Sequence, residues 1–111
     1  MANTDDLFKA SFGQHGCAFQ DAGGEITAPS GMIIIAITML AETTFTTLTA
    51  ENLDNGKSFG LPSGHTGAGS GGALVASANK FPAGLTIFGR WTHVVATADA
   101  DGGIICYFGP K

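Results

Sequence analysis

The chain has 111 residues, the size of a single domain with one core. Charged residues make up only 13% of it, and the formal net charge is −4. A soluble domain usually carries roughly 25% charged residues, so part of this surface is expected to be hidden in contacts with other subunits. The Lys and Arg residues are scattered rather than clustered, which argues against direct binding of nucleic acid.

Residues 1–13 predict an N-terminal segment or arm with at most a short helix. Asn3 or Thr4 would cap this helix, Phe8 and Phe12 share one face, and Gly13 ends it. Such a short helix is marginal in water, so both Phe side chains are candidates for contacts with the core or with a neighbouring subunit. The segment lacks the basic and apolar regions of a secretory signal, which favours synthesis in a cytoplasm.

After the N-terminal segment, β-branched and aromatic runs alternate with glycine-rich turns, a pattern typical of strands. Asp54-Asn55-Gly56 and Asp101-Gly102 have the residues of hairpin turns, and the second turn would join the last two strands. The predicted fold is all-β, a single-domain antiparallel sandwich, jelly roll or small barrel over residues 1–111. Strands are expected at residues 15–20, 25–28, 32–40, 43–50, 57–61, 73–77, 85–96 and 104–108.

The run over residues 32–40 is apolar on both sides. With strict alternation, one side carries Met32, Ile34, Ala36 and Leu40, and the other carries Ile33, Ile35, Ile37 and Met39. One side can meet the core, whereas the side with Ile33 needs a second sheet, the N-terminal segment or another subunit, and it is a candidate interface. The run is about half the length of a membrane-spanning helix, so no membrane association is expected.

Residues 60–72 are glycine-rich and predict a long loop. A G-x-G-x-x-G pattern in this loop lacks the preceding strand and the following helix of a dinucleotide site, so no cofactor is expected. Ser63, His65 and Asp54 are the residue types of a catalytic triad, although such a triad is identified by its geometry. The sequence therefore favours a protein that is not an enzyme, with a small cytoplasmic hydrolase using Ser63 and His65 as a weak alternative.

No metal site is expected from the ligand spacing. His15 and Cys17 could bind zinc together with His65, His93 or Cys106, but the spacing of structural zinc sites is missing.

The segment from Asp99 to Gly102 is similar to the middle of a calcium loop, yet the distal Glu of that loop is absent and a turn explains it better. Cys17 and Cys106 are expected to be free buried thiols in a reducing compartment, with a disulfide as the alternative.

Aromatic residues concentrate in the last third of the chain, at Phe81, Phe88, Trp91, Tyr107 and Phe108. On the long strand, alternation places Leu85, Ile87, Trp91 and Val95 toward the core and Phe88, Arg90, Thr92 and Val94 on the other side. The aromatic group could simply fill the core. It could also bind a partner or a sugar, since Trp, Tyr and Arg are common interface anchors, and the candidates for this are Phe88, Arg90, Trp91 and Tyr107.

The strand core Thr86-Ile-Phe-Gly-Arg-Trp-Thr92 and the ending Gly103-Ile-Ile-Cys-Tyr-Phe-Gly-Pro110 resemble small virion structural proteins of tailed bacteriophages, particularly marine ones. The likeness covers residues 81–111 and brings no catalytic residues with it. It implies a protein that decorates or cements a capsid, or forms an appendage on it, commonly as a trimer.

Together, these patterns predict a capsid decoration or cement subunit that works through subunit contacts alone. The expected partners are further copies of the chain, with a trimer preferred, and the major capsid protein or another virion protein. The expected location is the virion, after synthesis in the host cytoplasm. The alternative is a fibre or tail-tip module that binds host-surface glycans through the Arg90, Trp91 and Tyr107 region or the glycine-rich loop.

Overall fold

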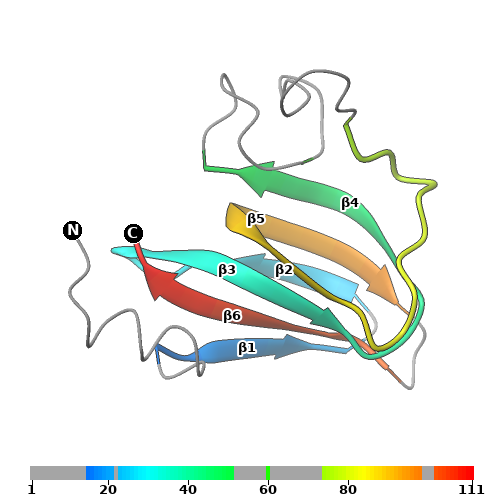
Figure 1. Ribbon diagram of the computed structural model, residues 1–111, viewed down its shortest axis with the longest axis horizontal. Helices are drawn as coiled ribbons and strands as arrows, with labels where there is room; N and C mark the ends of the chain where they lie inside the picture. The colour runs from blue at the N-terminus through cyan, green and yellow to red at the C-terminus, as the bar shows by residue number, and fades with distance from the viewer. Residues whose placement is uncertain (1–14, 22, 52–59, 61–73, 99–101) are drawn as a thin grey trace.

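The computed structural model describes residues 15–21, 23–51, 60, 74–98 and 102–111 (Figure 1). Within these ranges the chain is all-β without a helix, which confirms the predicted fold class. Its strands are β1 (Cys17–Gln20), β2 (Gly23–Thr27), β3 (Met32–Met39), β4 (Thr43–Ala50), β5 (Thr86–Ala98) and β6 (Ile104–Pro110). The predicted N-terminal helix with Phe8 and Phe12, the Asp54-Asn55-Gly56 turn and most of residues 57–72 lie outside the described residues.

The strand predicted over residues 73–77 is wrong for the part that the structure describes. Residues 74–76 are irregular, and a turn follows in which Asn79 N–H donates to the Ala76 carbonyl at 2.9 Å. The Asn79 side-chain oxygen also accepts a hydrogen bond from Ala76 N–H at 2.7 Å. A short polar side chain that binds its own backbone competes with strand pairing, and here it favours the turn.

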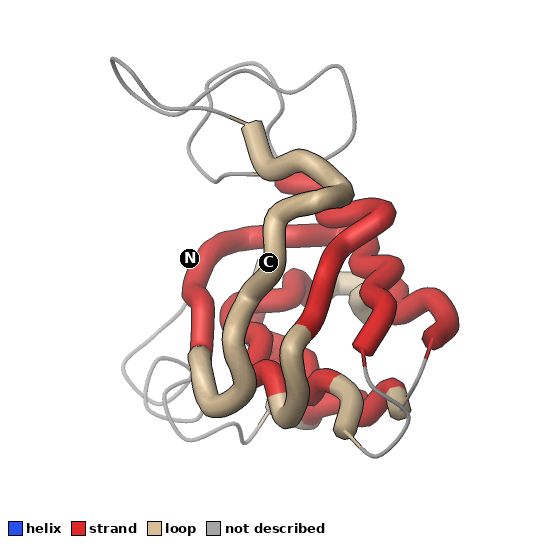
Figure 2. The backbone as a smooth tube through the Cα atoms, turned by 90° about the vertical axis from the view of Figure 1, so that its right-hand side faces the viewer, coloured by secondary structure: helices blue, strands red, loops and turns tan. Residues whose placement is uncertain are grey.

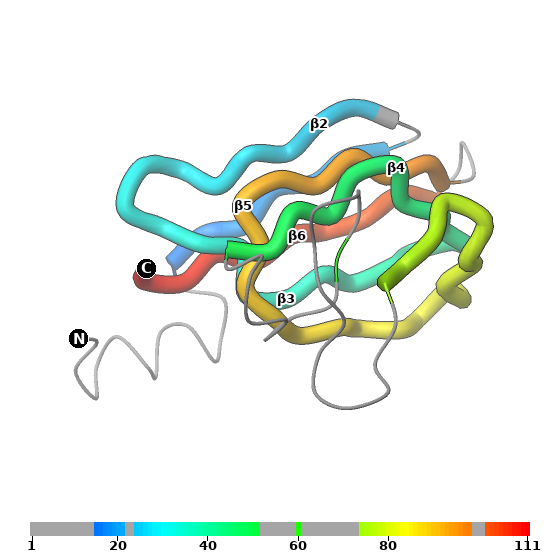
Figure 3. Tube along the Cα trace, turned by 90° about the horizontal axis from the view of Figure 1, so that it is seen from above, coloured from blue at the N-terminus to red at the C-terminus, as the bar shows by residue number. Residues whose placement is uncertain are grey.

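The strands form one antiparallel sheet, in the order β1-β6-β3-β5-β2, with β4 also paired to β5. The sheet curls until its two end strands, β1 and β2, approach each other, so it is nearly closed into a barrel (Figure 2). Seen from above, β2 lies on one side of the barrel and β3 on the other (Figure 3), and the strand pairing divides the sheet into two layers. The first layer contains β1, β6, β3 and the beginning of β5, and the second contains β2, β4 and the remainder of β5.

Strand β5 belongs to both layers because it turns a corner partway along its length (Figure 1). Its residues 86–91 pair with β3. Its residues 91–98 pair with β4 on one edge, and its residues 93–97 pair with β2 on the other. Gly89 is required at the corner, since a Cβ atom there would lie 2.6 Å from the Trp91 ring. The register with β4 also shifts between Trp91 and His93, which makes Thr92 an extra residue.

This shift corrects the predicted faces of β5. Trp91 and Val94 both point into the core, although strict alternation places them on opposite sides of the strand. Val95, predicted to face the core, is instead half-buried on the outside. A single extra residue reverses the alternation for every residue that follows it.

Strand β3 has a comparable irregularity at Ile35, where its register with β5 and β6 shifts. Ile34, Ile37 and Met39 all lie in the core cluster, so the predicted division of this strand into two faces is wrong after residue 34. The outward side of the strand is formed instead by Ala36 and Thr38, whose in-register neighbours on β6 and β5 also point outward.

The hairpin predicted at Asp101-Gly102 is also wrong, because β5 and β6 are not hydrogen-bonded neighbours. Strand β3 lies between them in the first layer, and the link from Ala98 to Ile104 connects the two layers.

The core fills the space between the layers, and Phe81 packs edge-on against Phe45 at its side with ring centroids 5.1 Å apart. The buried cluster contains Ile26, Ile34, Ile37, Met39, Phe45, Leu48, Ala50, Trp91, Val94, Ala96, Ile104, Cys106 and Phe108. The described residues contain no helix long and apolar enough to cross a membrane.

Candidate functional site

The outward side of the first layer is the candidate functional site. Two rows of in-register residues cross the four strands of this layer. The first row is Phe19, Ile105, Thr38 and Thr86, and the second row is Cys17, Tyr107, Ala36 and Phe88. Residues that are directly opposite each other in a sheet point to the same side, so these eight side chains share one surface, here called the outer face.

The outer face carries no charged residue and contains three aromatic side chains. Phe19 is 61% exposed and Phe88 is 75% exposed, the two largest exposed fractions among the large hydrophobic side chains that the structure describes. Tyr107 and Ile105 are half-buried between them. An exposed apolar patch that spans four strands is typical of an interaction surface, whereas scattered single apolar residues are not.

The polar atoms of the outer face are already partly satisfied. The Thr38 and Thr86 hydroxyls share a hydrogen bond of 2.8 Å across the β3–β5 pair. Burying a polar group is costly when it loses its hydrogen-bond partner. A partner protein that covers Thr38 and Thr86 leaves their mutual hydrogen bond in place, which lowers this cost.

The outward side of the second layer has the opposite character. It is rich in threonine and carries the pair of His93 and Glu25, whose Nε2 and Oε2 atoms lie 3.9 Å apart. Its members are Glu25, Thr27, Thr44, Thr47, Thr49, His93, Val95 and Thr97. The two sides of the barrel therefore differ, since one presents hydroxyl and charged groups to water and the other presents aromatic and aliphatic groups.

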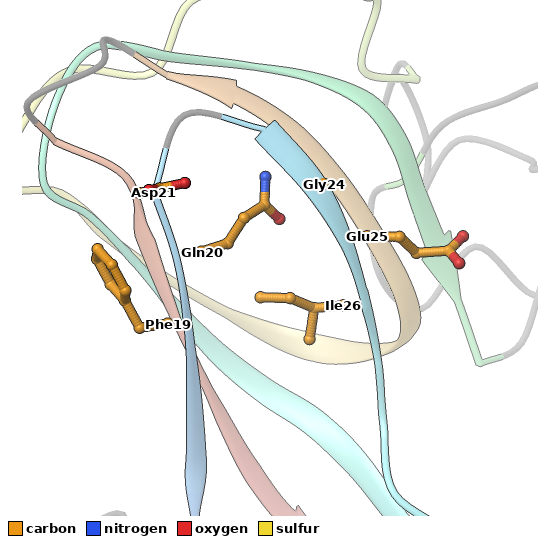
Figure 4. A pocket seen from close by; sticks show the side chains of 6 residues that line it. All are labelled: Phe19, Gln20, Asp21, Gly24, Glu25 and Ile26. Atoms are coloured by element: carbon orange, nitrogen blue, oxygen red, sulfur yellow. The ribbon is translucent and has the colours of Figure 1, made fainter.

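A cavity of about 380 Å³ lies between β1 and β2, the two end strands of the sheet. It is lined by Phe19, Gln20, Asp21, Gly24, Glu25 and Ile26. Figure 4 shows the Gln20 and Ile26 side chains in the gap between the two strands, whereas Phe19 and Glu25 point away from it. The cavity therefore lies along a seam of the barrel, between β1 and β2.

Gln20 closes this seam from the inside. Its Nε2 donates a 2.9 Å hydrogen bond to the Ala96 carbonyl of β5, on the far side of the gap. Its Oε1 is buried and has no hydrogen-bond partner among the described residues. A buried acceptor without a partner costs roughly 1–3 kcal/mol, so the seam is a weak point of the barrel.

Of the predicted interface residues, Phe88 and Tyr107 lie together on the outer face, both in register with Ala36. Ile33, Ile37 and Met39 are fully buried within the chain and offer no surface to a partner.

Ile35 is half-buried, and it lies so close to Gly109 that a Cβ atom there would be 2.9 Å from the isoleucine Cγ2. Phe8 and Phe12 lie outside the described residues.

The structure does not bring Arg90, Trp91 and Tyr107 together as a surface site. Trp91 has no exposed area, because the corner of β5 directs its ring into the core. Arg90 is exposed and binds Glu51 through both carboxylate oxygens, at 2.6 Å from Nε and 3.1 Å from Nη2. The hydrogen bonds that Arg90 donates to the Glu51 carboxylate raise the pKa of Arg90 above its ordinary value.

The two cysteines are free, and only Cys106 is buried as predicted, since Cys17 is exposed on the outer face. Cys106 pairs in register with Ala18, so the thiols of Cys17 and Cys106 point to opposite sides of the sheet and cannot form a disulfide. Burial raises the pKa of the Cys106 thiol to about 12. Among the described residues, no three His, Cys, Asp or Glu side chains are grouped as a metal site would require.

Sequence reasoning missed Cys17, Phe19, Thr86, Ile105 and the short residues of β3 as parts of this surface. The alternation of Cys17 with Phe19, and of Ile105 with Tyr107, was a usable signal that these pairs share a side of their strands. Their meeting across four strands depends on strand order and register, which the alternation does not specify.

Comparisons with known proteins identify no relative of the chain. No protein-family model, no curated protein and no solved structure matches the chain.

Proposed function

We propose that this protein is a virion structural protein, a capsid decoration or cement subunit that stabilises a bacteriophage shell through subunit contacts. The observation that carries the proposal is the outer face, a surface of eight uncharged side chains whose Phe19 and Phe88 are mostly exposed. Such a surface is stabilised when a partner covers it, and no chemical step is needed.

The resemblance of the C-terminal third supports the virion setting. The two segments that carry it, residues 86–92 and 103–110, contain the beginning of β5 and all of β6. They supply Thr86, Phe88, Ile105 and Tyr107, half of the outer face. The likeness to phage structural proteins thus includes half of the surface that we propose for assembly.

The difference between the two layers also supports a decoration role. A subunit bound to a shell needs one surface for the shell or its neighbours and another that stays in water. The outer face and the threonine-rich side of the second layer meet these two needs on opposite sides of the barrel. The trimer implied by the resemblance and the major capsid protein as a partner remain predictions.

The test is mass spectrometry of purified virions of the phage that encodes the chain, with peptides quantified against the major capsid protein. The expected result is a stoichiometric, multi-copy component. Shells that lack the chain should bind the added protein, and Phe88→Ser should weaken this binding while Leu74→Ser should not, because Leu74 is an exposed apolar residue outside the strands that form the outer face. Absence of the chain from virions would overturn the proposal.

The alternative function, a fibre or tail-tip module for host glycans, would use the surface aromatics Phe19, Phe88 and Tyr107 instead of the buried Trp91. Aromatic side chains are common anchors for ligands at exposed surfaces. This function predicts a low copy number per virion and binding of the isolated protein on a glycan array. A high copy number without glycan binding would support the decoration function and exclude the glycan-binding function.

A further inference from the structure

We propose that the outer face pairs with the outer face of a second copy of the chain, through a two-fold axis that runs parallel to the strands between β6 and β3. The inference deepens the proposed function, because it names the partner of the same surface. A two-fold contact at this face differs from the three-fold contact that the resemblance implies, and the oligomeric state in solution distinguishes the two.

The argument begins with the sizes of the side chains in the two rows of the outer face. In the first row, the large side chains Phe19 and Ile105 are followed by the shorter Thr38 and Thr86. In the second row, Cys17 and Ala36 are short, and Tyr107 and Phe88 are large. The outer face therefore has four large side chains and four short ones.

A two-fold axis along the strands brings β1 opposite β5 of the partner, and β6 opposite β3 of the partner. Every large side chain then meets a short one. Phe19 faces the partner's Thr86, and Phe88 faces the partner's Cys17. In the middle, Ile105 faces the partner's Thr38, and Tyr107 faces the partner's Ala36.

This self-complementarity is what an isologous contact requires, because the same surface must fit itself. An axis across the strands would place Ile105 against the partner's Tyr107 and would leave short side chains facing short ones. Two sheets that pack face to face usually keep their strands aligned within about 30°, and the axis along the strands satisfies this.

The chemistry of the outer face also suits a second copy. None of its residues is charged, so no like charges meet in the contact. The Thr38 and Thr86 hydroxyls bind each other at 2.8 Å and can be covered together. A partner that was recognised through charge would find nothing to bind on this surface.

The exposed area indicates a weak, reversible pair. At roughly 200 Å² for an aromatic side chain, Phe19 and Phe88 together expose on the order of 270 Å². With the half-buried members, two faces would bury about 900 Å², below the range of stable specific interfaces. The expected dissociation constant is therefore in the micromolar range or weaker, and many such contacts would act together in an assembly.

Sedimentation equilibrium of the whole chain, from about 1 µM to about 1 mM, tests the pair. The wild type should pass from monomer to dimer over this range. Cys17→Phe should weaken the dimer at least about tenfold, because the new ring would collide with the partner's Phe88. Cys17→Ala is the matched control and should leave the dimer unchanged, as should Leu74→Ser away from the face.

The Cys17→Phe variant separates a specific pair from general stickiness, since it makes the face more apolar. Tighter association of Cys17→Phe, or a wild type that stays monomeric at about 1 mM, would overturn the inference. Circular dichroism confirms that each variant is folded. A second readout is the alkylation rate of Cys17 in the wild type, which should fall as the protein concentration rises into the dimer range.

The two proposals fail separately. A wild-type trimer in solution would overturn the two-fold pair and leave the decoration function standing. A dimer with the expected response to Cys17→Phe, combined with absence of the chain from virions, would support the pair and overturn the decoration function.

Discussion

Gly89 and Trp91 are fitted to each other at the corner of β5, where a Cβ atom on Gly89 would lie 2.6 Å from the indole ring. The ring is fully buried, so it has little room to move away. The corner also carries the chain from one layer of the barrel to the other, and the core depends on it.

We therefore expect Gly89→Ala to lower the free energy of unfolding by about 1–3 kcal/mol, the usual cost of overpacking. Denaturant unfolding followed by tryptophan fluorescence measures the loss. In a Trp91→Phe background, unfolding is followed by circular dichroism, and the same substitution should cost less because the smaller ring leaves space for the methyl group. Equal costs in both backgrounds would show that the ring is not the cause.

Neighbouring positions on β3 should respond in opposite ways to a charge. Ile37→Asp places a carboxylate in the core and should unfold the domain, because an unpaired buried charge is very unfavourable. Thr38→Asp, on the half-buried outward side, should keep the fold and abolish the pairing of outer faces. Circular dichroism and sedimentation separate the two effects. A folded Ile37→Asp variant would contradict the assignment of this strand.

The Cys106 thiol should make the fold sensitive to alkaline pH. Its pKa is raised from 9.0 to about 12 by burial, so the folded state keeps a proton that the unfolded state loses. The contribution to stability is complete below pH 9 and is lost as the pH rises toward 12, at up to about 1.4 kcal/mol per pH unit. Cys106→Ala should flatten this slope between pH 9 and pH 11, whereas Cys17→Ala should not.

The thiols also differ in access to reagents. Under native conditions at low protein concentration, a thiol reagent should modify Cys17 and spare Cys106, since only Cys17 is exposed. Both thiols should react in denaturant. Rapid modification of Cys106 in the folded protein would indicate that the barrel opens readily.

The seam at Gln20 should tolerate an apolar residue. Gln20→Met loses the hydrogen bond to the Ala96 carbonyl and also removes the buried acceptor without a partner among the described residues, so the net change is expected within about 1 kcal/mol. Gln20→Glu should cost at least about 2 kcal/mol at neutral pH, because it buries a charge and removes the donor. Thermal unfolding compares the two. A large loss in Gln20→Met would show that the hydrogen bond is essential for closing the seam.

The Arg90–Glu51 pair should contribute little to stability despite its two hydrogen bonds. Both side chains are partly exposed, at 46% and 28%, so water and salt screen their attraction. A double-mutant cycle with Arg90→Gln and Glu51→Gln should give a coupling below about 1 kcal/mol that shrinks at high salt. A coupling that did not depend on salt would argue for a role in holding the corner of β5.

Local composition and alternation were sufficient for the class of the fold and for most of its strands. The β-branched runs between glycines place β3, β4, β5 and β6 close to their observed bounds, because side-chain shape and turn chemistry act over a few residues. The shortage of charge likewise predicted that part of the surface carries no charge, since 13% charged residues are few for a domain of this size.

Which residues form that surface was decided only by the tertiary structure. The extra residues at Ile35 and Thr92 reverse the alternation, so Ile37 and Met39 turn into the core and Ala36 and Thr38 turn outward. The corner at Gly89 buries Trp91 and leaves Phe88 exposed. Bulges and corners arise from pairing and packing between strands that are distant in the sequence, and a pattern read along one strand does not contain them.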